Sequence, residues 1–129
     1  MTREEYRVAG MAEPISHYTD AVRAGDLLFV SGIVPVDADG GLVGGDDVVE
    51  QAEAVFENMR IVLAAAGSQP QDVVKVTVFL TDIGDRARIN PVRQAFFGDA
   101  RPASTLVEIS RLAIPGAKIE VEAVAALNS

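Results

Sequence analysis

The segments 101-RPASTLVEISRL-112 and 118-KIEVEAVA-125 decide the fold of this chain. In the second segment apolar residues occupy every other position and alternate with the carboxylates of Glu120 and Glu122, which is the period of a β-strand. The link between the segments contains Pro115-Gly116, a strong turn signal. The two segments therefore predict a pair of strands hydrogen-bonded to each other. Spacing alone leaves open whether the carboxylates form a solvated face or a catalytic site.

Composition limits the classes of protein to consider. The chain has 129 residues, of which 49% are hydrophobic, so we expect a single domain over residues 1–129 with a real core. No apolar run approaches the ~18 residues of a membrane span, and the N-terminus lacks an apolar signal core, so a cytoplasmic protein is expected. The absence of cysteine excludes thiolate metal sites, disulfides and a cysteine nucleophile. One histidine cannot form a multi-histidine metal site, and we expect no metal and no cofactor.

The net charge of the chain indicates whether it binds nucleic acid. The formal net charge is −8 and the sequence pI is about 4.5. Proteins that bind nucleic acid normally present a basic surface to the phosphates. Here the 11 lysines and arginines are scattered and only 5% of residues are aromatic, so we expect no nucleic-acid partner.

The N-terminal third predicts strands and one small-residue pair. Residues 6–8 predict a short edge strand. Residues 27–31 (Leu-Leu-Phe-Val-Ser) are too uniformly apolar for a half-exposed strand, so we expect burial on both faces. The pair Ser31-Gly32 at its end either lets a ligand approach the backbone or marks a bulge that bends the sheet.

Two helices and a third strand follow. An apolar stripe at three- and four-residue spacing predicts a helix that begins near Asp47, in a capping box with Glu50, and ends at Gly67. Residues 73–80 are rich in β-branched side chains and predict a strand. A second helix is expected over residues 85–97, although Pro91 is awkward inside it. Asn90 could instead cap a helix that begins at Pro91.

These elements predict an α+β domain with a mixed sheet of five to six strands and two helices on one face. Two helices cover only one face of such a sheet, so the other face needs a partner. The small alanine and valine side chains of 119–125 suit close packing against a copy of the chain. We therefore expect a closed oligomer.

Six segments, in the same order, resemble the RidA/YjgF family of imine and enamine deaminases. They are the C-terminal signature of Pro102–Leu112 with 118–125, the stretch 29-FVSGIVP-35, and the ranges 17–22, 51–67, 74–80 and 90–97. The resemblance implies a chorismate-mutase-like (YjgF-like) single domain. It also implies a homotrimer with three small-molecule clefts between subunits.

The resemblance also implies site residues. In the family a glutamate at the position of Glu120 helps to position or deprotonate the attacking water, and a tyrosine matched by Tyr18 lies beside the ligand. Substrate-binding roles are further implied for Ser31, Gly32, Asn90 and Ser104. Gln51 and Asn58 match the family as well, but no chemistry requires them, and we expect both to be structural.

Position 104 is where the sequence departs from the family. In the family, an arginine at this position binds the carboxylate of a 2-imino or 2-enamino acid, whereas this chain has Ser104. A serine cannot supply the planar fork of a guanidinium. Two other cations could compensate: Arg101, which strand alternation places on the opposite face, and Arg93, which stands where the family usually has a tyrosine.

The sequence is compatible with two functions. The first is a deaminase-type hydrolysis of a reactive imine, enamine or related C–N compound, without the standard arginine-anchored recognition of 2-imino acids. The second is a trimer without catalytic activity that binds a small metabolite in its clefts.

Overall fold

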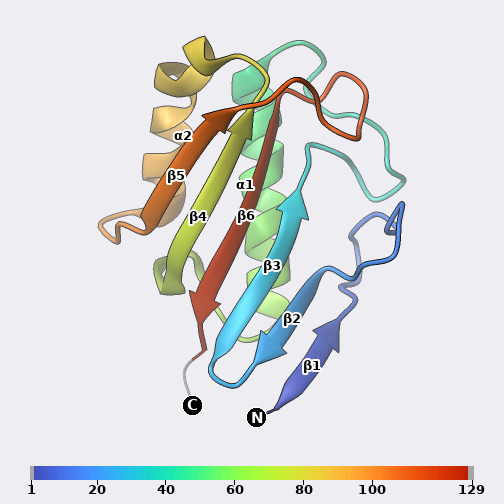
Figure 1. Ribbon diagram of the computed structural model, residues 1–129, viewed down its shortest axis with the longest axis vertical. Helices are drawn as coiled ribbons and strands as arrows, with labels where there is room; N and C mark the ends of the chain where they lie inside the picture. The colour runs from blue at the N-terminus through green and yellow to red at the C-terminus, as the bar shows by residue number, and fades with distance from the viewer. Residues whose placement is uncertain (1, 128–129) are drawn as a thin grey trace.

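The computed structural model describes residues 2–127, which form one α+β domain: a six-stranded sheet with two helices on one face (Figure 1). The strands are β1 (Arg3–Tyr6), β2 (Ala21–Ala24), β3 (Leu27–Ile33), β4 (Val73–Leu80), β5 (Ala103–Glu108) and β6 (Ile119–Ala126). The helices are α1 (Val48–Ala65) and α2 (Arg86–Phe97), preceded by the short 3-10 turns η1 (Pro70–Asp72) and η2 (Ile83–Asp85). Among the described residues, no helix is both long and apolar enough to cross a membrane.

The sheet order, β1-β2-β3-β6-β4-β5, corrects the predicted hairpin. β5 and β6 are not hydrogen-bonded to each other; β5 pairs in parallel with β4, and β6 lies between β3 and β4, antiparallel to both. The reason is α2, which carries the chain back to the start of β4 and so obliges β5 to run parallel to it. The turn at Pro115-Gly116 belongs to a longer connection that leads from the edge of the sheet to its centre.

The core lies between the sheet and the two helices. β6 contributes its alternate apolar residues, as the pattern predicts, and α1 contributes the predicted stripe. The buried members of these two elements are Val48, Ala52, Val55, Phe56, Met59, Val62, Leu63, Ile119, Val121, Ala123 and Ala125. The expectation that the apolar side of β6 packs against a second copy is therefore wrong. That side is already covered by α1.

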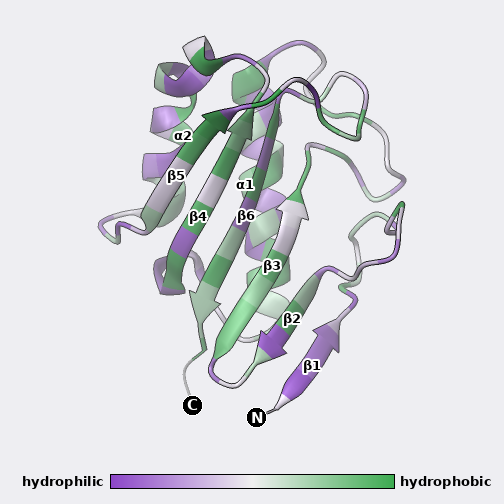
Figure 2. Cartoon of the chain, viewed as in Figure 1, coloured by the Kyte–Doolittle hydropathy of each residue, from purple (hydrophilic) through white to green (hydrophobic). Residues whose placement is uncertain are grey.

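The opposite face of the sheet carries no helix (Figure 1), and β3 does not have the expected burial on both faces. Leu27 is 40% exposed and Phe29 is 47% exposed on this uncovered face. Figure 2 shows that β3 and β4 are largely hydrophobic while the edge strand β1 is hydrophilic. The uniform apolar run of β3 reflects one face packed in the core and one apolar face left open.

The ends of the helices follow the sequence signals in part. The Asp47 carboxylate caps α1 by accepting a hydrogen bond from the Val49 N–H at 2.9 Å, and Gly67 follows the helix with φ of 77°. α2 runs unbroken through Asn90 and Pro91, so the alternative that Asn90 caps a helix starting at Pro91 is wrong. η2 leads directly into α2, which therefore begins before the proline. The edge strand lies at 3–6 rather than 6–8.

Candidate functional site

A cavity of about 370 Å³ opens at the end of β3, beside the start of β6. Its walls come from the segment between β1 and β2, from the end of β3 and the residues after it, from α1, and from the connection between β5 and β6. Four of the residues that the sequence singled out line it: Tyr18, Ser31, Gly32 and Glu120. The structure thus brings these four residues together at one cavity, while their roles toward a ligand stay predictions.

A bulge in β3 shapes the floor of the cavity. Val30 pairs with Ala123 and Ile33 with Val121, so two residues of β3, Ser31 and Gly32, stand opposite a single residue of β6. A bulge of this kind bends the strand and redirects side chains. The Ser-Gly pair therefore marks a bulge, one of the two predicted possibilities, and it also lines the cavity. The approach of a ligand to its backbone stays a prediction.

Gly32 makes room for the carboxylate of Glu120. A Cβ atom placed on Gly32 would overlap the Glu120 carboxyl group. Burial raises the pKa of Glu120 above its ordinary value, and the neighbouring charge of Glu122 raises it further. A carboxylate with a raised pKa is a stronger proton acceptor, so Glu120 is suited to act as a general base on a ligand in the cavity.

Ser31 holds the segment that carries Tyr18. Its hydroxyl donates a hydrogen bond to the Thr19 carbonyl at 2.6 Å, and its N–H donates to the Asp20 carbonyl at 3.0 Å. The Tyr18 side chain is 49% exposed, and its hydroxyl accepts a hydrogen bond from the Ile15 N–H at 3.4 Å. Because its proton is used in this bond, Ser31 can offer a ligand only its oxygen lone pairs. Its main effect is to position the wall of the cavity.

Sequence reasoning missed the Arg7–Asp20 ion pair that fastens this wall. Arg7 Nη1 donates to the buried Asp20 carboxylate at 2.6 Å, and the Val8 N–H donates to the same oxygen at 2.7 Å. Arg7 Nη2 also donates to the Met11 and Ala12 carbonyls, at 3.0 and 3.1 Å. Asp20 lies in the family-like segment 17–22 but had no assigned role there, and Arg7 lies outside all six segments. Their 13-residue separation gave no signal.

Gln51 and Asn58 are structural, as expected. The fully buried Gln51 amide donates to the Gly45 and Gly116 carbonyls and accepts a hydrogen bond from the Lys118 N–H at 2.7 Å. It therefore joins α1 to the chain just before β6 and fixes the position of Glu120. Asn58 Nδ2 donates to the Val36 carbonyl at 3.0 Å, although Asn58 also borders the cavity.

The cavity is acidic. All of its lining residues belong to the described part of the chain, and none is Lys, Arg or His. The acids among them are Glu13, Asp20, Asp37 and Glu120, of which Glu13 and Asp20 are both paired with Arg7. None of these lining side chains offers a positive charge to a carboxylate ligand, and Arg7 is already bound to two of the acids. Over residues 2–127, no group of three or more His, Cys, Asp or Glu side chains is arranged to hold a metal ion.

The other predicted residues gather elsewhere, at the edge formed by α2 and β5. Arg93 Nη2 donates a hydrogen bond to the Ser104 hydroxyl oxygen at 2.9 Å. Asn90 lies one turn earlier on α2, on the same side as Arg93. Partial burial lowers the pKa of Arg93 from its ordinary value, although the guanidinium remains charged at neutral pH.

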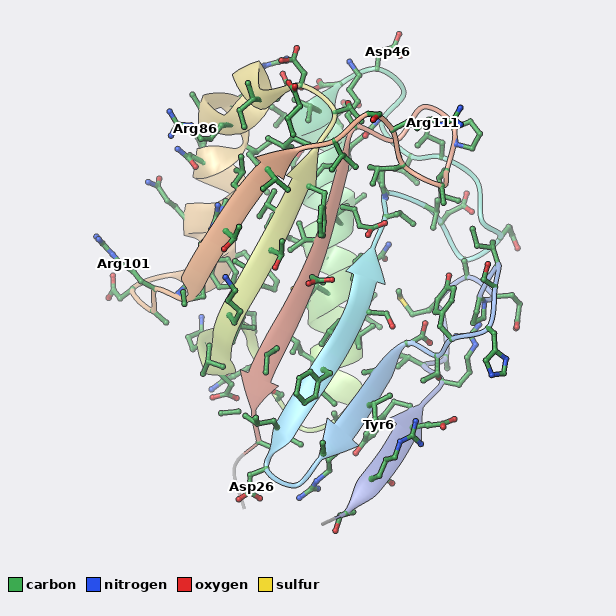
Figure 3. The ribbon with its side chains drawn as sticks, in the orientation of Figure 1. Tyr6, Asp26, Asp46, Arg86, Arg101 and Arg111 are labelled. Carbon is green, nitrogen blue, oxygen red and sulfur yellow. The ribbon has the colours of Figure 1, made fainter. Side chains whose placement is uncertain are left out.

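Only one of the two candidate cations reaches Ser104. Arg101 is exposed, precedes β5 and points away from the sheet edge (Figure 3). Arg93 reaches Ser104 from the helix, across the gap between α2 and β5. A guanidinium thus adjoins position 104, although the residue that supplies it belongs to another element.

One chain cannot bring the two regions to one small ligand. Glu120 pairs with Phe79, which pairs with Val107, so Ser104 is two strands across and three residues along the sheet. This separation corresponds to roughly 14 Å between the Cα atoms of Glu120 and Ser104. The two side chains also point to opposite faces, because Ser104 neighbours the core residue Val76 on the helix side.

Comparisons with known proteins agree on one family. A family model described as Endoribonuclease L-PSP matches residues 10–127. A RutC family protein of Pyrococcus abyssi is 39% identical over 97% of this chain and 98% of its own length. A 2-iminobutanoate/2-iminopropanoate deaminase of Salmonella typhimurium is 40% identical over 86% of this chain and 88% of its own length. The crystal structure of the YjgF gene product of E. coli superposes with a TM-score of 0.87 at 32% identity, covering 97% of this chain and 99% of that one.

Proposed function

This chain belongs to the RidA/YjgF family, the family whose model is described as Endoribonuclease L-PSP, and on that premise we propose that it hydrolyses a reactive imine or enamine to a carbonyl compound and ammonia. The observation that carries the proposal is the Glu120 carboxylate, seated over Gly32 in a cavity with its pKa raised by burial. A base in such a position can activate a water molecule beside a small ligand.

The reaction balances without any redox step. Water adds to the carbon of the C=N bond while Glu120 accepts one of its protons and the nitrogen takes a proton from solvent, which gives a neutral carbinolamine. Glu120 then returns its proton to the nitrogen, which leaves as ammonia when the C–N bond breaks, and the hydroxyl releases its proton to solvent as the C=O bond forms. One water is consumed and one ammonia is released, so the proposed chemistry requires no electron carrier.

Charge favours this reaction over cleavage of RNA. The net charge of −8 and the acidic lining of the cavity would repel a polyphosphate backbone. The aromatic content of 5% also leaves few rings on which bases could stack. A small molecule with a C=N group fits the cavity volume of about 370 Å³.

We propose that the working form is a homotrimer with its ligand clefts between subunits. Two features support this: the exposed apolar side chains of Leu27 and Phe29 on the uncovered sheet face, and the division of the site between two regions of one chain. We propose a cyclic arrangement in which the α2/β5 edge of one copy lies against the cavity of the next, because this would join the two regions in one cleft. Sedimentation of the wild-type protein as a trimer is expected, and a monomer would contradict this arrangement.

The test of the reaction is Glu120→Gln, which keeps the shape of the side chain and removes the base. With freshly generated 2-iminobutanoate and other imines, we expect kcat to fall by ~10²–10⁴-fold, the usual contribution of general acid–base catalysis. Glu53→Gln, an exposed change on α1, is the matched control and should leave the rate unchanged. Wild-type rates equal to those of the Glu120 variant would refute the proposal and favour a non-catalytic trimer that binds a metabolite.

A further inference from the structure

We propose that Arg93, oriented by Ser104, is the side chain that binds the substrate carboxylate in this protein, in place of the arginine that the family has at position 104. This inference rests on the proposed function. It names the group that anchors the substrate, and it assigns that role to a side chain of α2 rather than to one of β5.

The first argument is the unused hydrogen-bonding capacity of Arg93. A guanidinium has five N–H donors, and the one recorded side-chain bond of Arg93 goes to Ser104. Within residues 2–127, no carboxylate lies within 4.0 Å of Arg93, whereas Arg60 has one such partner and Arg7 and Arg88 have two each. A partly buried cation without a counter-ion is costly unless an anion joins it. The unpaired edge of the guanidinium therefore indicates a place for an anion.

The second argument is the chemistry of the neighbouring groups. Ser104 accepts the hydrogen bond from Arg93 through its oxygen, so its own proton is free to be donated. Asn90, one turn before Arg93, is partly buried, and no hydrogen bond is recorded for its amide among the described residues. A guanidinium fork flanked by a hydroxyl and an amide matches a planar carboxylate with two oxygens.

The third argument is the distribution of charge. The segment 86–101 holds Arg86, Arg88, Arg93 and Arg101, four of the 11 basic residues of the chain, against the single acid Asp99. The rest of the chain is strongly acidic, as is the lining of the cavity. The α2/β5 edge is thus a local region of positive potential on an acidic protein, which attracts a small anion.

Together these points explain how an acidic cavity could accept an acidic substrate. Glu120 would repel a carboxylate held beside it, so the carboxylate has to lie on a cation at the far side of the cleft. Arg93 of the adjoining copy would supply that cation, while the C=N group stays near Glu120. The short Ser104 side chain leaves room for the guanidinium and holds it in place.

The experiment compares two substrates that differ only in charge: 2-iminobutanoate and the corresponding 2-imino amide, which keeps the C=N group. We expect Arg93→Ala and Arg93→Gln to lower kcat/KM for the carboxylate substrate by ~10²-fold, as expected for a lost charged hydrogen-bond pair, and to leave the amide rate nearly unchanged. The retained amide rate also shows that the variants fold. Ser104→Ala should cause a smaller loss, mainly in KM, and Ser104→Thr should restore wild-type kinetics.

Two further variants serve as controls. Arg86→Ala removes the same charge from the same helix at an exposed position (Figure 3), and Arg101→Ala removes the rival cation; neither should change the preference for the carboxylate. An equal loss on both substrates in the Arg93 variants, no loss on either, or a loss of selectivity in Arg101→Ala would overturn the assignment.

Failure of the proposed function can be told apart from failure of this inference. If the wild-type protein hydrolyses neither substrate, calorimetric binding of 2-oxobutanoate still tests Arg93. Binding weakened by ~10²-fold in Arg93→Ala would support the carboxylate site while the reaction itself is rejected. Equal binding by wild type and variant would overturn the site as well.

Discussion

The cavity at the end of β3 and the edge formed by α2 and β5 are built in opposite ways. The cavity is acidic, and its walls are fastened by internal hydrogen bonds such as those of Ser31 and Asp20. The α2/β5 edge is basic, and its central bond, from Arg93 to Ser104, leaves most donors unused. One region therefore has the geometry of a base and the other that of an anion receptor. The cavity has the base but no cation among its lining residues, and the α2/β5 edge has the cation but not Glu120.

A substitution confined to the cavity should lower activity without altering selectivity. In Gly32→Ala the new Cβ would displace the Glu120 carboxyl group, which is the mobile end of a flexible side chain. We expect kcat to fall by ~10–10²-fold on both the carboxylate and the amide substrate, because a misplacement of about 1 Å has effects of this size.

The control for Gly32→Ala is the thermal unfolding midpoint. It should change little, because the displaced group is a side-chain end rather than backbone. A loss of activity on the carboxylate substrate alone would contradict the assignment of the base to the cavity and of the anion-binding group to the α2/β5 edge. Only the Arg93 variants should show such a loss.

The pH dependence of kcat should be set by Glu120 in the cavity and not by Arg93 at the α2/β5 edge. Glu120 must be ionised to accept a proton, and its pKa is raised by burial and then by Glu122, so activity should decline as the pH falls through that raised pKa. Glu122→Gln removes the second cause, lowers the pKa of Glu120 and moves the acid limb of the kcat profile to lower pH.

Glu53→Gln and Arg93→Ala are the comparisons for this pH profile. Both should leave the acid limb of kcat where the wild type has it, because neither residue contributes to the raised pKa of Glu120. A shift to higher pH in Glu122→Gln would show that the proton acceptor is not Glu120.

Local signals in the sequence predicted the local parts of this structure. The cap at Asp47, the stripe of α1 and the strand at 73–80 all depend on residues close in sequence or on a strand period. That Gly32 lies beside Glu120 is a contact between distant segments, and only the family resemblance had grouped these residues in one site. The buried and exposed sides of β6 were also predicted correctly.

The errors concern contacts between distant segments. The expected β5–β6 hairpin relied on sequence proximity, whereas α2 decides that β5 runs parallel to β4. The exposure of Leu27 and Phe29 depends on which face the helices cover, which an apolar run does not reveal. The contact of Arg93 with Ser104 is not among these errors: Arg93 was one of the two cations named for position 104, and the structure shows that it is the one that reaches Ser104.

The most direct test of the shared site is complementation between two impaired variants. Glu120→Gln lacks the base and Arg93→Ala lacks the anchor, and each alone should be nearly inactive on 2-iminobutanoate. When the two are co-expressed or refolded together in equal amounts, random assembly of a cyclic trimer gives about a quarter of the clefts both intact residues. A mixture with the Glu120→Gln, Arg93→Ala double variant in place of Arg93→Ala is the control and should gain nothing. Recovery of roughly that fraction of wild-type activity is the predicted result; activity no greater than the sum of the separate variants would contradict a site shared between copies.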